Sequence, residues 1–162
     1  MANVFFMRHG DTFTGNQEAM TVAEASKKIS LSELGKSQCR KVVLPRDLDL
    51  IVISDSKRTK ESAKIVLKAN KMSLPIKVEK KLHPWDSGSN DWKTYYEHLY
   101  EFVINPDKKG PWESRKSLVK RVDSVLRKYS DKNILVIAHS ALLGAYLDMH
   151  DSMPCAQLIR VK

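Results

Sequence analysis

The side chains best suited to chemistry are two arginines, two histidines and one aspartate that each follow a short apolar run. They are Arg8, His9, Arg58, Asp86 and His139. Runs of this length are typical of buried strands, and in an open parallel sheet the ligand site lies beyond the carboxyl ends of the strands. The sequence therefore predicts that four strands deliver these five side chains to one edge of a sheet.

Two histidines beside two arginines suit a phosphoryl group better than a metal ion. Guanidinium groups match the geometry of phosphate oxygens, and their positive charge repels a nearby cation. Such cations also lower the pKa of an imidazole, and an unprotonated imidazole is a competent nucleophile. We interpret the cluster as an anion cradle that contains a nucleophile, and we expect neither a metal site nor a cofactor.

The elements that must position these residues alternate between strand-like runs and longer runs of helical period. We expect strands over Val4–Met7, Leu48–Ser54, Ile76–Leu82, Asn133–Ala138 and Ala156–Val161. We expect helices over Ser32–Leu44, Ser56–Asn70, Asp91–Ile104 and Trp112–Lys128. This alternation predicts an α/β fold, a three-layer α/β/α sandwich with a mostly parallel central sheet.

One domain over residues 1–162 is expected, because the chain has no long linker and no internal repeat. The helix expected over 91–104 carries an aromatic stripe, and such stripes more often pack into a core than form a platform for a ligand. The polar segment 11–30 gives no clear pattern.

The composition argues against some classes of function but does not identify one. The net charge of +9 favours anionic partners, but the basic residues form no stripe interleaved with aromatic residues, so nucleic acid is not expected as a partner. The longest apolar runs are strand-sized and far short of the roughly 20 residues of a membrane span. The two cysteines show no metal-binding spacing, and the N-terminus does not resemble a signal peptide, so we expect a cytoplasmic protein that does not enter a membrane.

Several segments resemble the histidine phosphatase superfamily, which includes cofactor-dependent phosphoglycerate mutase and many small phosphatases. The strand followed by Arg8-His9-Gly10 matches the family's opening motif. Segment 31–38 resembles its Leu-Thr, Gly, Gln helix opening, and segment 54–63 resembles its Ser-Pro-Leu-x-Arg-Ala-x-Gln-Thr-Ala block. Segments 82–88 and 110–114 resemble the family's acid loop and its Gly-Glu-Ser segment, and 134–140 stands where the family has a strand that ends in its second His.

The resemblance implies a phosphoglycerate mutase-like fold and a role for each matched residue. It implies that His9 becomes phosphohistidine and that Arg8, Arg58 and His139 bind the phosphoryl oxygens. Asn16 and Ser140 are further candidates for the phosphate site, although Asn16 falls one residue later than the family's common spacing and Ser140 replaces its common Gly.

The general acid is the main departure from the family pattern. Pro84 stands where many members have Glu, and Asp86 is the best substitute. Asp86 is equally compatible with a structural role, because Asp is favoured in turns that contain Gly. If Asp86 does not reach the leaving oxygen, aryl phosphates should turn over better than alkyl phosphates.

We therefore expect a metal-independent phosphomonoesterase whose substrate is a phosphorylated small molecule or a phosphoprotein. One alternative is phosphoryl transfer of the phosphoglycerate mutase type, although 162 residues leave little room for the lid that such an enzyme needs. A catalytically weak phosphate-binding regulatory module is a second alternative. The sequence leaves the oligomeric state open.

Overall fold

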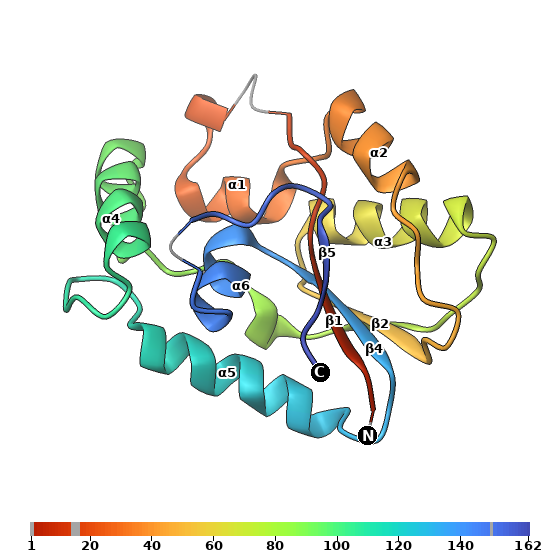
Figure 1. Cartoon of the computed structure of the whole chain (residues 1–162). Helices are drawn as coiled ribbons and strands as arrows, with labels where there is room; N and C mark the ends of the chain where they lie inside the picture. The colour runs from red at the N-terminus through yellow and green to blue at the C-terminus, as the bar shows by residue number, and fades with distance from the viewer. Residues whose placement is uncertain (1, 14–16, 150) are drawn as a thin grey trace.

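The computed structural model describes residues 2–13, 17–149 and 151–162 (Figure 1). The strands are β1 (Val4–Arg8), β2 (Leu50–Ile53), β3 (Ile76–Val78), β4 (Ile134–Ala138) and β5 (Leu158–Arg160). The α-helices are α1 (Val22–Lys28), α2 (Glu33–Arg40), α3 (Lys57–Ala69), α4 (Trp92–Ile104), α5 (Arg115–Lys128) and α6 (Ser140–Tyr146). Short 3-10 helices span Gln17–Ala19 and Lys80–Leu82.

The five strands form one sheet in the order β3-β2-β4-β1-β5. The pairs β2–β3, β2–β4 and β1–β4 are parallel, and β5 adds to the β1 edge in the antiparallel sense. Every residue of β2 and β4 is buried, as expected for strands covered by helices on both faces. The mostly parallel α/β sheet predicted from the sequence is confirmed.

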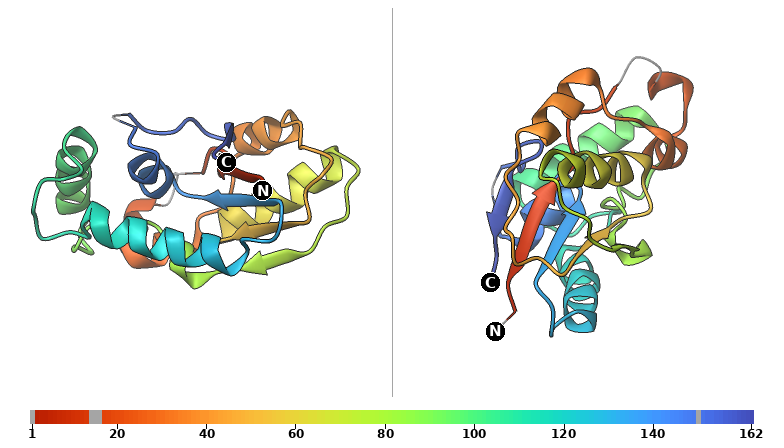
Figure 2. Two further views of the ribbon diagram at one scale, coloured as in Figure 1. Left: turned by 60° about the horizontal axis from the view of Figure 1, so that its bottom comes forward. Right: turned by 90° about the vertical axis from the view of Figure 1, so that its right-hand side faces the viewer.

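Two hydrophobic clusters lie on opposite faces of the sheet. Phe6, Val52 and Val136 belong to the cluster that also holds Val122 of α5. Their neighbours along the strands point the other way, and the second cluster contains Ile51 together with residues of α2 and α3. Figures 1 and 2 show α5 on one side of the strands and α2 and α3 on the other, which gives the predicted three layers.

The structure corrects several expected boundaries. The strand expected over 76–82 ends at Val78, because a 3-10 turn occupies Lys80–Leu82. The helix expected to begin at Trp112 begins at Arg115, where the Ser114 hydroxyl accepts a hydrogen bond from the backbone N–H of Ser117 and so caps the first turn.

Two helices were not expected. The segment 11–30 contains α1, which begins with a capping box in which Thr21 and Glu24 satisfy each other's backbone N–H groups. Helix α6 begins directly after His139 and covers the same face of the sheet as α5. Both helices supply side chains to the site described below.

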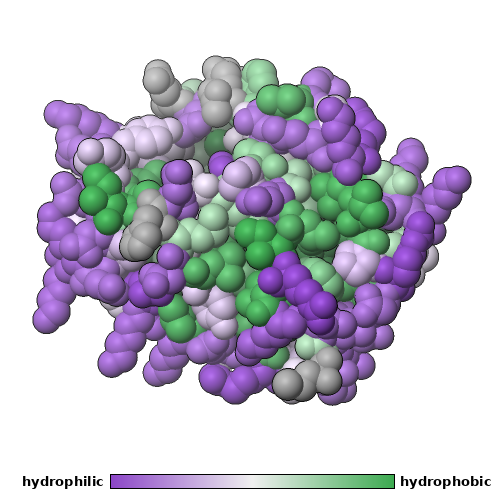
Figure 3. Space-filling model, viewed as in Figure 1, coloured by the Kyte–Doolittle hydropathy of each residue, from purple (hydrophilic) through white to green (hydrophobic). Residues whose placement is uncertain are grey.

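None of the helices in the described parts of the chain combines the length and the apolar character needed to cross a membrane. On the face viewed in Figure 1, hydrophilic side chains surround a hydrophobic area over β5 and α6 (Figure 3). On that face the hydrophilic side chains lie both around the rim and near the centre, and they form no single stripe.

Candidate active site

The carboxyl ends of β1 and β4 bring the two histidines predicted from the sequence, His9 and His139, side by side. Arg8 at the end of β1 is in register with Ala138 at the end of β4, and the backbone N–H of His9 donates to the carbonyl of Ala138 at 3.1 Å. The two imidazole rings have their centroids 5.4 Å apart. Arg58, from the first turn of α3, lies between them and hydrogen-bonds to both. The convergence that the strand pattern predicted is therefore present for these four residues.

His9 is held in one tautomer by two neighbours. Its Nδ1 lies 2.7 Å from the carbonyl oxygen of Gly10, which can only accept, so Nδ1 carries the proton. Its Nε2 accepts a hydrogen bond from Nε of Arg58 at 3.2 Å, so the lone pair of Nε2 points into the cluster. Burial, and then the positive charges of Arg58 and Arg8, lower the pKa of His9 to about 3. The imidazole is therefore uncharged at neutral pH and presents Nε2 as its nucleophilic atom.

His139 is held in the opposite tautomer. Nη2 of Arg58 donates to its Nδ1 at 3.1 Å, which leaves the proton on Nε2 to be donated to the hydroxyl of Ser54 at 2.8 Å. The Ser54 hydroxyl also lies 3.0 Å from the hydroxyl of Thr59, whose own proton reaches backbone carbonyls. Burial, followed by the charge of Arg58, lowers the pKa of His139 well below its ordinary value.

Sequence reasoning missed the hydroxyl partners of His139. Ser54 and Thr59 belong to the same block that supplies Arg58, and both are fully buried. Buried hydroxyl groups need hydrogen-bond partners. Two hydroxyl residues near Arg58 in the sequence could therefore have indicated that their side chains bind another residue of the site.

Arg58 is a buried cation whose hydrogen-bond partners are all uncharged. It is only 8% exposed, and its third bond runs from Nη1 to the backbone carbonyl of Ser26 in α1 at 2.6 Å. Burial lowers the pKa of its guanidinium to about 10, which still leaves it charged at neutral pH. A phosphoryl group would supply the negative charge that this cation lacks.

Arg8 and Ser140 line the same cavity and have unused polar atoms. Arg8 donates through Nη1 to the carbonyl of Met153 at 2.9 Å. Its Nε and the hydroxyl of Ser140 are buried without a hydrogen-bond partner among the described residues. Both atoms are therefore available to a ligand in the cavity.

The loop after His9 is fixed by a close approach between two glycines. A Cβ on Gly10 would lie 2.5 Å from the carbonyl oxygen of Gly35 in α2, so no larger residue fits there. The backbone N–H of Gly10 donates to the hydroxyl of Ser62, and the Asp11 carboxylate accepts from the Ser32 hydroxyl at 2.6 Å. Residues of α2 and α3 thus hold the Arg8-His9-Gly10 segment in place.

The site opens into a cavity of about 430 Å³ with two kinds of wall. Arg8, His9, Arg58 and His139 form its polar end. Helix α4 contributes an aromatic and apolar wall of Trp92, Tyr95, Tyr96, Leu99 and Val103. The expectation that the aromatic stripe of this helix packs into the core holds for Phe102 and for Leu99, which packs against the core and also borders the cavity, whereas Trp92, Tyr95 and Tyr96 face the cavity.

Asp86 does not line this cavity. Its carboxylate is exposed and accepts a hydrogen bond from the backbone N–H of Gly88 at 2.8 Å, which is the turn role that the sequence left open. Gly88 itself has a φ of +70°, a conformation that suits glycine. Among the described side chains, no Asp or Glu lines the cavity.

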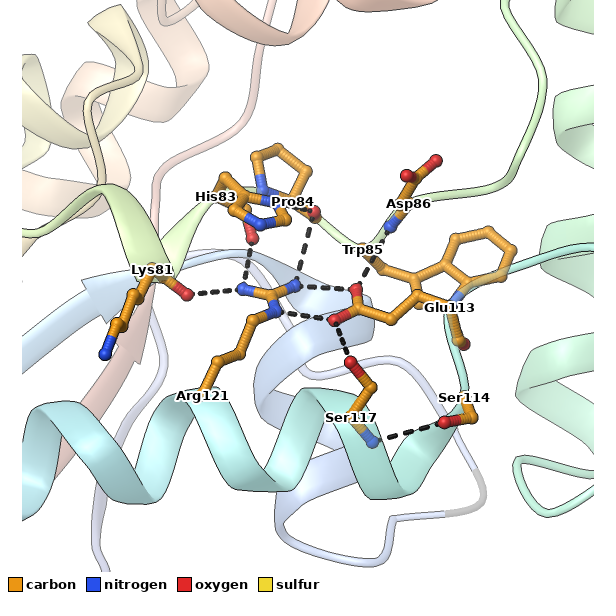
Figure 4. A network of polar contacts seen from close by, with 9 residues as sticks. All are labelled: Lys81, His83, Pro84, Trp85, Asp86, Glu113, Ser114, Ser117 and Arg121. Carbon is orange, nitrogen blue, oxygen red and sulfur yellow. Dashed lines mark hydrogen bonds and ion pairs between the residues drawn. The ribbon is translucent and has the colours of Figure 1, made fainter.

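A buried ion pair explains the position of Asp86 (Figure 4). The carboxylate of Glu113 binds the guanidinium of Arg121 at 2.7 Å, and both side chains are about nine-tenths buried. Arg121 also donates to the carbonyls of Lys81 and His83, and Glu113 accepts from the backbone N–H of Asp86.

This network fastens the loop 81–86 to α5. Pro84 and Trp85 of the loop line the cavity, and Trp85 donates through Nε1 to the carbonyl of Glu113 at 3.0 Å. Figure 4 shows the carboxyl group of Asp86 pointing away from the Glu113–Arg121 pair. The network therefore sets one wall of the cavity and leaves Asp86 outside it. Asn16, the remaining candidate, lies outside the residues that the structure describes.

Among the described residues, no three His, Cys, Asp or Glu side chains are grouped as a metal ion would require. The prediction that the cluster suits an anion rests on its two arginines and two histidines and not on this absence.

Comparison with known families and structures gives one consistent result. A family model described as the histidine phosphatase superfamily (branch 1) matches residues 4–162. No curated protein matches the chain.

Similar solved structures include phosphatases and a mutase. A mycobacterial glucosyl-3-phosphoglycerate phosphatase is 19% identical with a TM-score of 0.73, over 98% of this chain and 89% of its own. A phosphoglycerate mutase from Bacillus anthracis is 18% identical with a TM-score of 0.71, over 98% and 86%. An alpha-ribazole phosphatase from Shigella flexneri is 17% identical with a TM-score of 0.67, over 99% and 90%. At these identities the likeness concerns the fold.

Proposed function

Because the chain belongs to branch 1 of the histidine phosphatase superfamily, we propose that it is a metal-independent phosphatase that hydrolyses phosphomonoesters through a phosphohistidine on His9. The observation that carries this proposal is the state of His9. Its imidazole is uncharged, its Nδ1 proton is held by Gly10, and its Nε2 faces a buried arginine. A neutral imidazole fixed among cations is the arrangement that attack on a phosphate dianion requires.

In the first step Nε2 of His9 attacks phosphorus, and the bond from phosphorus to the ester oxygen breaks. The phosphoryl oxygens take over the hydrogen bond that Nε of Arg58 makes to Nε2, which frees the lone pair for attack. Arg8 and Arg58 neutralise the charge on the transferring group, a role that guanidinium groups commonly fill in phosphoryl transfer. The proton stays on Nδ1 of His9, hydrogen-bonded to the carbonyl of Gly10, so the phosphorylated ring carries a positive charge that favours later release.

In the second step water attacks the phosphohistidine, inorganic phosphate leaves, and His9 returns to its neutral state. His139 lies 5.4 Å from His9 between ring centroids and is oriented by Ser54. Its Nδ1, which accepts a hydrogen bond from Arg58 in this structure, becomes free to accept a proton from the attacking water when Arg58 shifts to the phosphate.

The decisive experiment is a metal-free assay with an aryl phosphate on the wild type and on His9→Ala. We expect a loss of at least about a thousandfold in kcat, the magnitude typical of removing a covalent nucleophile. The exposed His83 provides a matched control, and His83→Ala should retain activity. Trapping of an acid-labile, base-stable phosphoenzyme in the wild type alone would identify the intermediate.

The same assay separates the alternatives. Comparable activity in the wild type and in His9→Ala would eliminate the mechanism. Transfer of the phosphoryl group to a second hydroxyl compound in preference to water would favour a mutase. Tight phosphate binding without turnover would favour a regulatory module that binds a phosphorylated small molecule or a phosphoprotein.

A further inference from the structure

One wall of the cavity that contains the histidines is formed by one face of α4. Trp92, Tyr95, Tyr96 and Leu99 follow the spacing i, i+3, i+4 and i+7, which places them on one side of a helix, and all four line the cavity. The ring centroids of Trp92 and Tyr95 are 5.6 Å apart, and those of Tyr95 and Tyr96 are 5.3 Å apart, both pairs in edge-to-face geometry. The helix therefore presents a continuous aromatic surface to the cavity that contains His9.

Two of these rings, those of Trp92 and Tyr96, are held by hydrogen bonds before any ligand arrives. The indole N–H of Trp92 donates to the backbone carbonyl of Met20 at 2.7 Å. The hydroxyl of Tyr96 accepts from the side chain of Gln17 at 2.8 Å. Because both polar tips are engaged outside the wall, the ring faces do not have to reorganise to meet a ligand, and a preorganised surface binds more tightly than a mobile one.

The side of the cavity contributed by α1 is mostly apolar, with Ser26 as its one polar lining residue. Val22, Ala25 and Ile29, from this helix and its end, line the cavity together with the aromatic face of α4. The cations, by contrast, come from the ends of β1 and α3. The cavity thus combines a group of cations that suits a phosphoryl group with aromatic and apolar side chains, and the described lining residues from α1 and α4 include no charged side chain.

Packing into the core does not by itself explain the aromatic face of α4, because part of that face is exposed to solvent. Phe102, on the same helix, is buried as a core residue is, and its ring stacks on the ring of Trp85 with the two centroids 4.7 Å apart. Tyr96 is 53% exposed although it belongs to the aromatic wall. Aromatic rings left beside a cavity retain apolar surface that a ligand can still bury, and each such contact adds to binding.

From this juxtaposition we propose that the phosphate ester hydrolysed at His9 is an aryl phosphate whose ring lies against Trp92 and Tyr95. The proposal rests on the proposed function and names its substrate class. In the reaction the phosphorus to phenolic oxygen bond breaks, the phosphoryl group passes to Nε2 of His9, and the phenolate leaves with the bonding electron pair. A phenolate is a weaker base than an alkoxide, so it leaves without a fully transferred proton and then takes a proton from water.

Binding of inert phosphonates tests the substrate class separately from catalysis. We would measure dissociation constants of the wild type by calorimetry for inorganic phosphate, methylphosphonate, cyclohexylphosphonate and phenylphosphonate, whose carbon to phosphorus bond is not cleaved. Phenylphosphonate should bind about tenfold more tightly than methylphosphonate, because one aromatic contact contributes roughly 1–3 kcal/mol and each 1.4 kcal/mol is about tenfold. Cyclohexylphosphonate, of similar size but not aromatic, should bind between the two.

Two variants of Tyr95 locate the effect. Tyr95→Leu removes the ring and should weaken phenylphosphonate about fivefold while inorganic phosphate binds as before. Tyr95→Phe keeps the ring and should bind phenylphosphonate like the wild type. Normal binding of inorganic phosphate also shows that a variant is folded.

The outcomes distinguish this inference from the proposed function. If inorganic phosphate binds and phenylphosphonate and methylphosphonate bind equally, the aryl class is wrong and the phosphatase proposal stands. If inorganic phosphate does not bind, or His9→Ala retains full activity, the proposed function itself fails.

A further arm distinguishes a small aryl phosphate from a phosphotyrosine side chain. It compares phosphonomethylphenylalanine as a free amino acid and within a short peptide. Tighter binding of the peptide indicates a protein substrate, and equal or weaker binding of the peptide indicates a small molecule. Both results support the aryl class, whereas binding of the free amino acid no tighter than methylphosphonate would overturn it.

Discussion

Replacing Arg58 by methionine should stabilise the fold while it destroys the site. Arg58 is 8% exposed, and the groups that accept its three hydrogen bonds, on His9, His139 and Ser26, are all uncharged. No carboxylate pairs with it among the described residues. A buried charge without a partner is unfavourable for folding, and an apolar side chain of similar length removes that charge.

The lowered pKa of Arg58 gives the magnitude. Burial brings the pKa to about 10, about 2.5 pH units below the ordinary value, which corresponds to roughly 3 kcal/mol at 1.36 kcal/mol per unit. Losing the three hydrogen bonds offsets part of this, at about 0.5 kcal/mol each, because water in the cavity can replace them. The expected net gain is about 2 kcal/mol, which raises Tm by roughly 4–8 °C for a domain of this size.

The assay is urea unfolding in buffer without phosphate, with the exposed helical Arg40 as a matched control. Arg40→Met should stay within about 0.5 kcal/mol of the wild type, as exposed substitutions do. Added inorganic phosphate should stabilise the wild type and Arg40→Met, because a ligand that binds only the folded state raises the stability of that state. The stability of Arg58→Met should not change when phosphate is added. In the phosphatase assay Arg58→Met should lose about 10²- to 10⁴-fold in kcat/KM, since two charge-assisted hydrogen bonds are worth roughly 3–6 kcal/mol.

The reasoning would be refuted if Arg58→Met were less stable than the wild type by more than about 1 kcal/mol while Arg40→Met was unchanged. That result would mean that the hydrogen bonds of Arg58 outweigh the desolvation of its charge. Retention of phosphate stabilisation in Arg58→Met would contradict its place in the anion site.

Three further predictions concern stability. Burial lowers the pKa of His9 to about 3, so below about pH 6.5 the unfolded chain binds a proton at His9 that the folded chain does not. The urea midpoint should therefore decrease as the pH falls below 6.5, with His9 contributing about 2 kcal/mol to the loss of stability between pH 6.5 and 5. The pKa of buried His139 is lowered as well, so His139→Asn should make the urea midpoint depend less steeply on pH. Gly10→Ala should lower the free energy of unfolding by more than about 2 kcal/mol in denaturant titration, because its Cβ would lie 2.5 Å from the Gly35 carbonyl oxygen; a neutral result would mean that this approach relaxes easily. Arg121→Met should lower the free energy of unfolding, measured by thermal unfolding, by about 3–5 kcal/mol, because the buried carboxylate of Glu113 loses its partner. A decrease of less than about 1 kcal/mol would mean that this ion pair does not hold the loop tightly.

The order of apolar runs along the chain was enough to predict the sheet. Continuous apolar runs such as those expected as strands over 48–54 and 133–138 are typical of parallel strands covered on both faces, and the structure has buried strands within them at Leu50–Ile53 and Ile134–Ala138. The rule that ligands bind beyond the carboxyl ends of such strands then predicts that Arg8, His9 and His139 lie together. These are local patterns combined with a general rule of topology, so they can be read from one sequence.

Element ends and loops were less readable. The capping box at Thr21 and Glu24 was visible in the sequence as a Thr followed three residues later by Glu, yet the polar segment around it hid α1. Asp86 was a plausible acid by spacing alone. Its exclusion from the cavity depends on contacts with Glu113, a residue 27 positions away, which no local pattern reports.

The sequence by itself determined the fold class, the family resemblance and the four residues that converge at the candidate site, because these follow from local periodicity and short motifs. Only the tertiary structure decided the tautomers of the two histidines, the unpaired charge of Arg58 and the aromatic wall beside them. Each of these depends on which atoms from distant segments approach within hydrogen-bonding or van der Waals distance, and burial sets the energies involved. Helix α4 shows the difference, because its aromatic spacing was evident from the sequence but the cavity that its face borders was not.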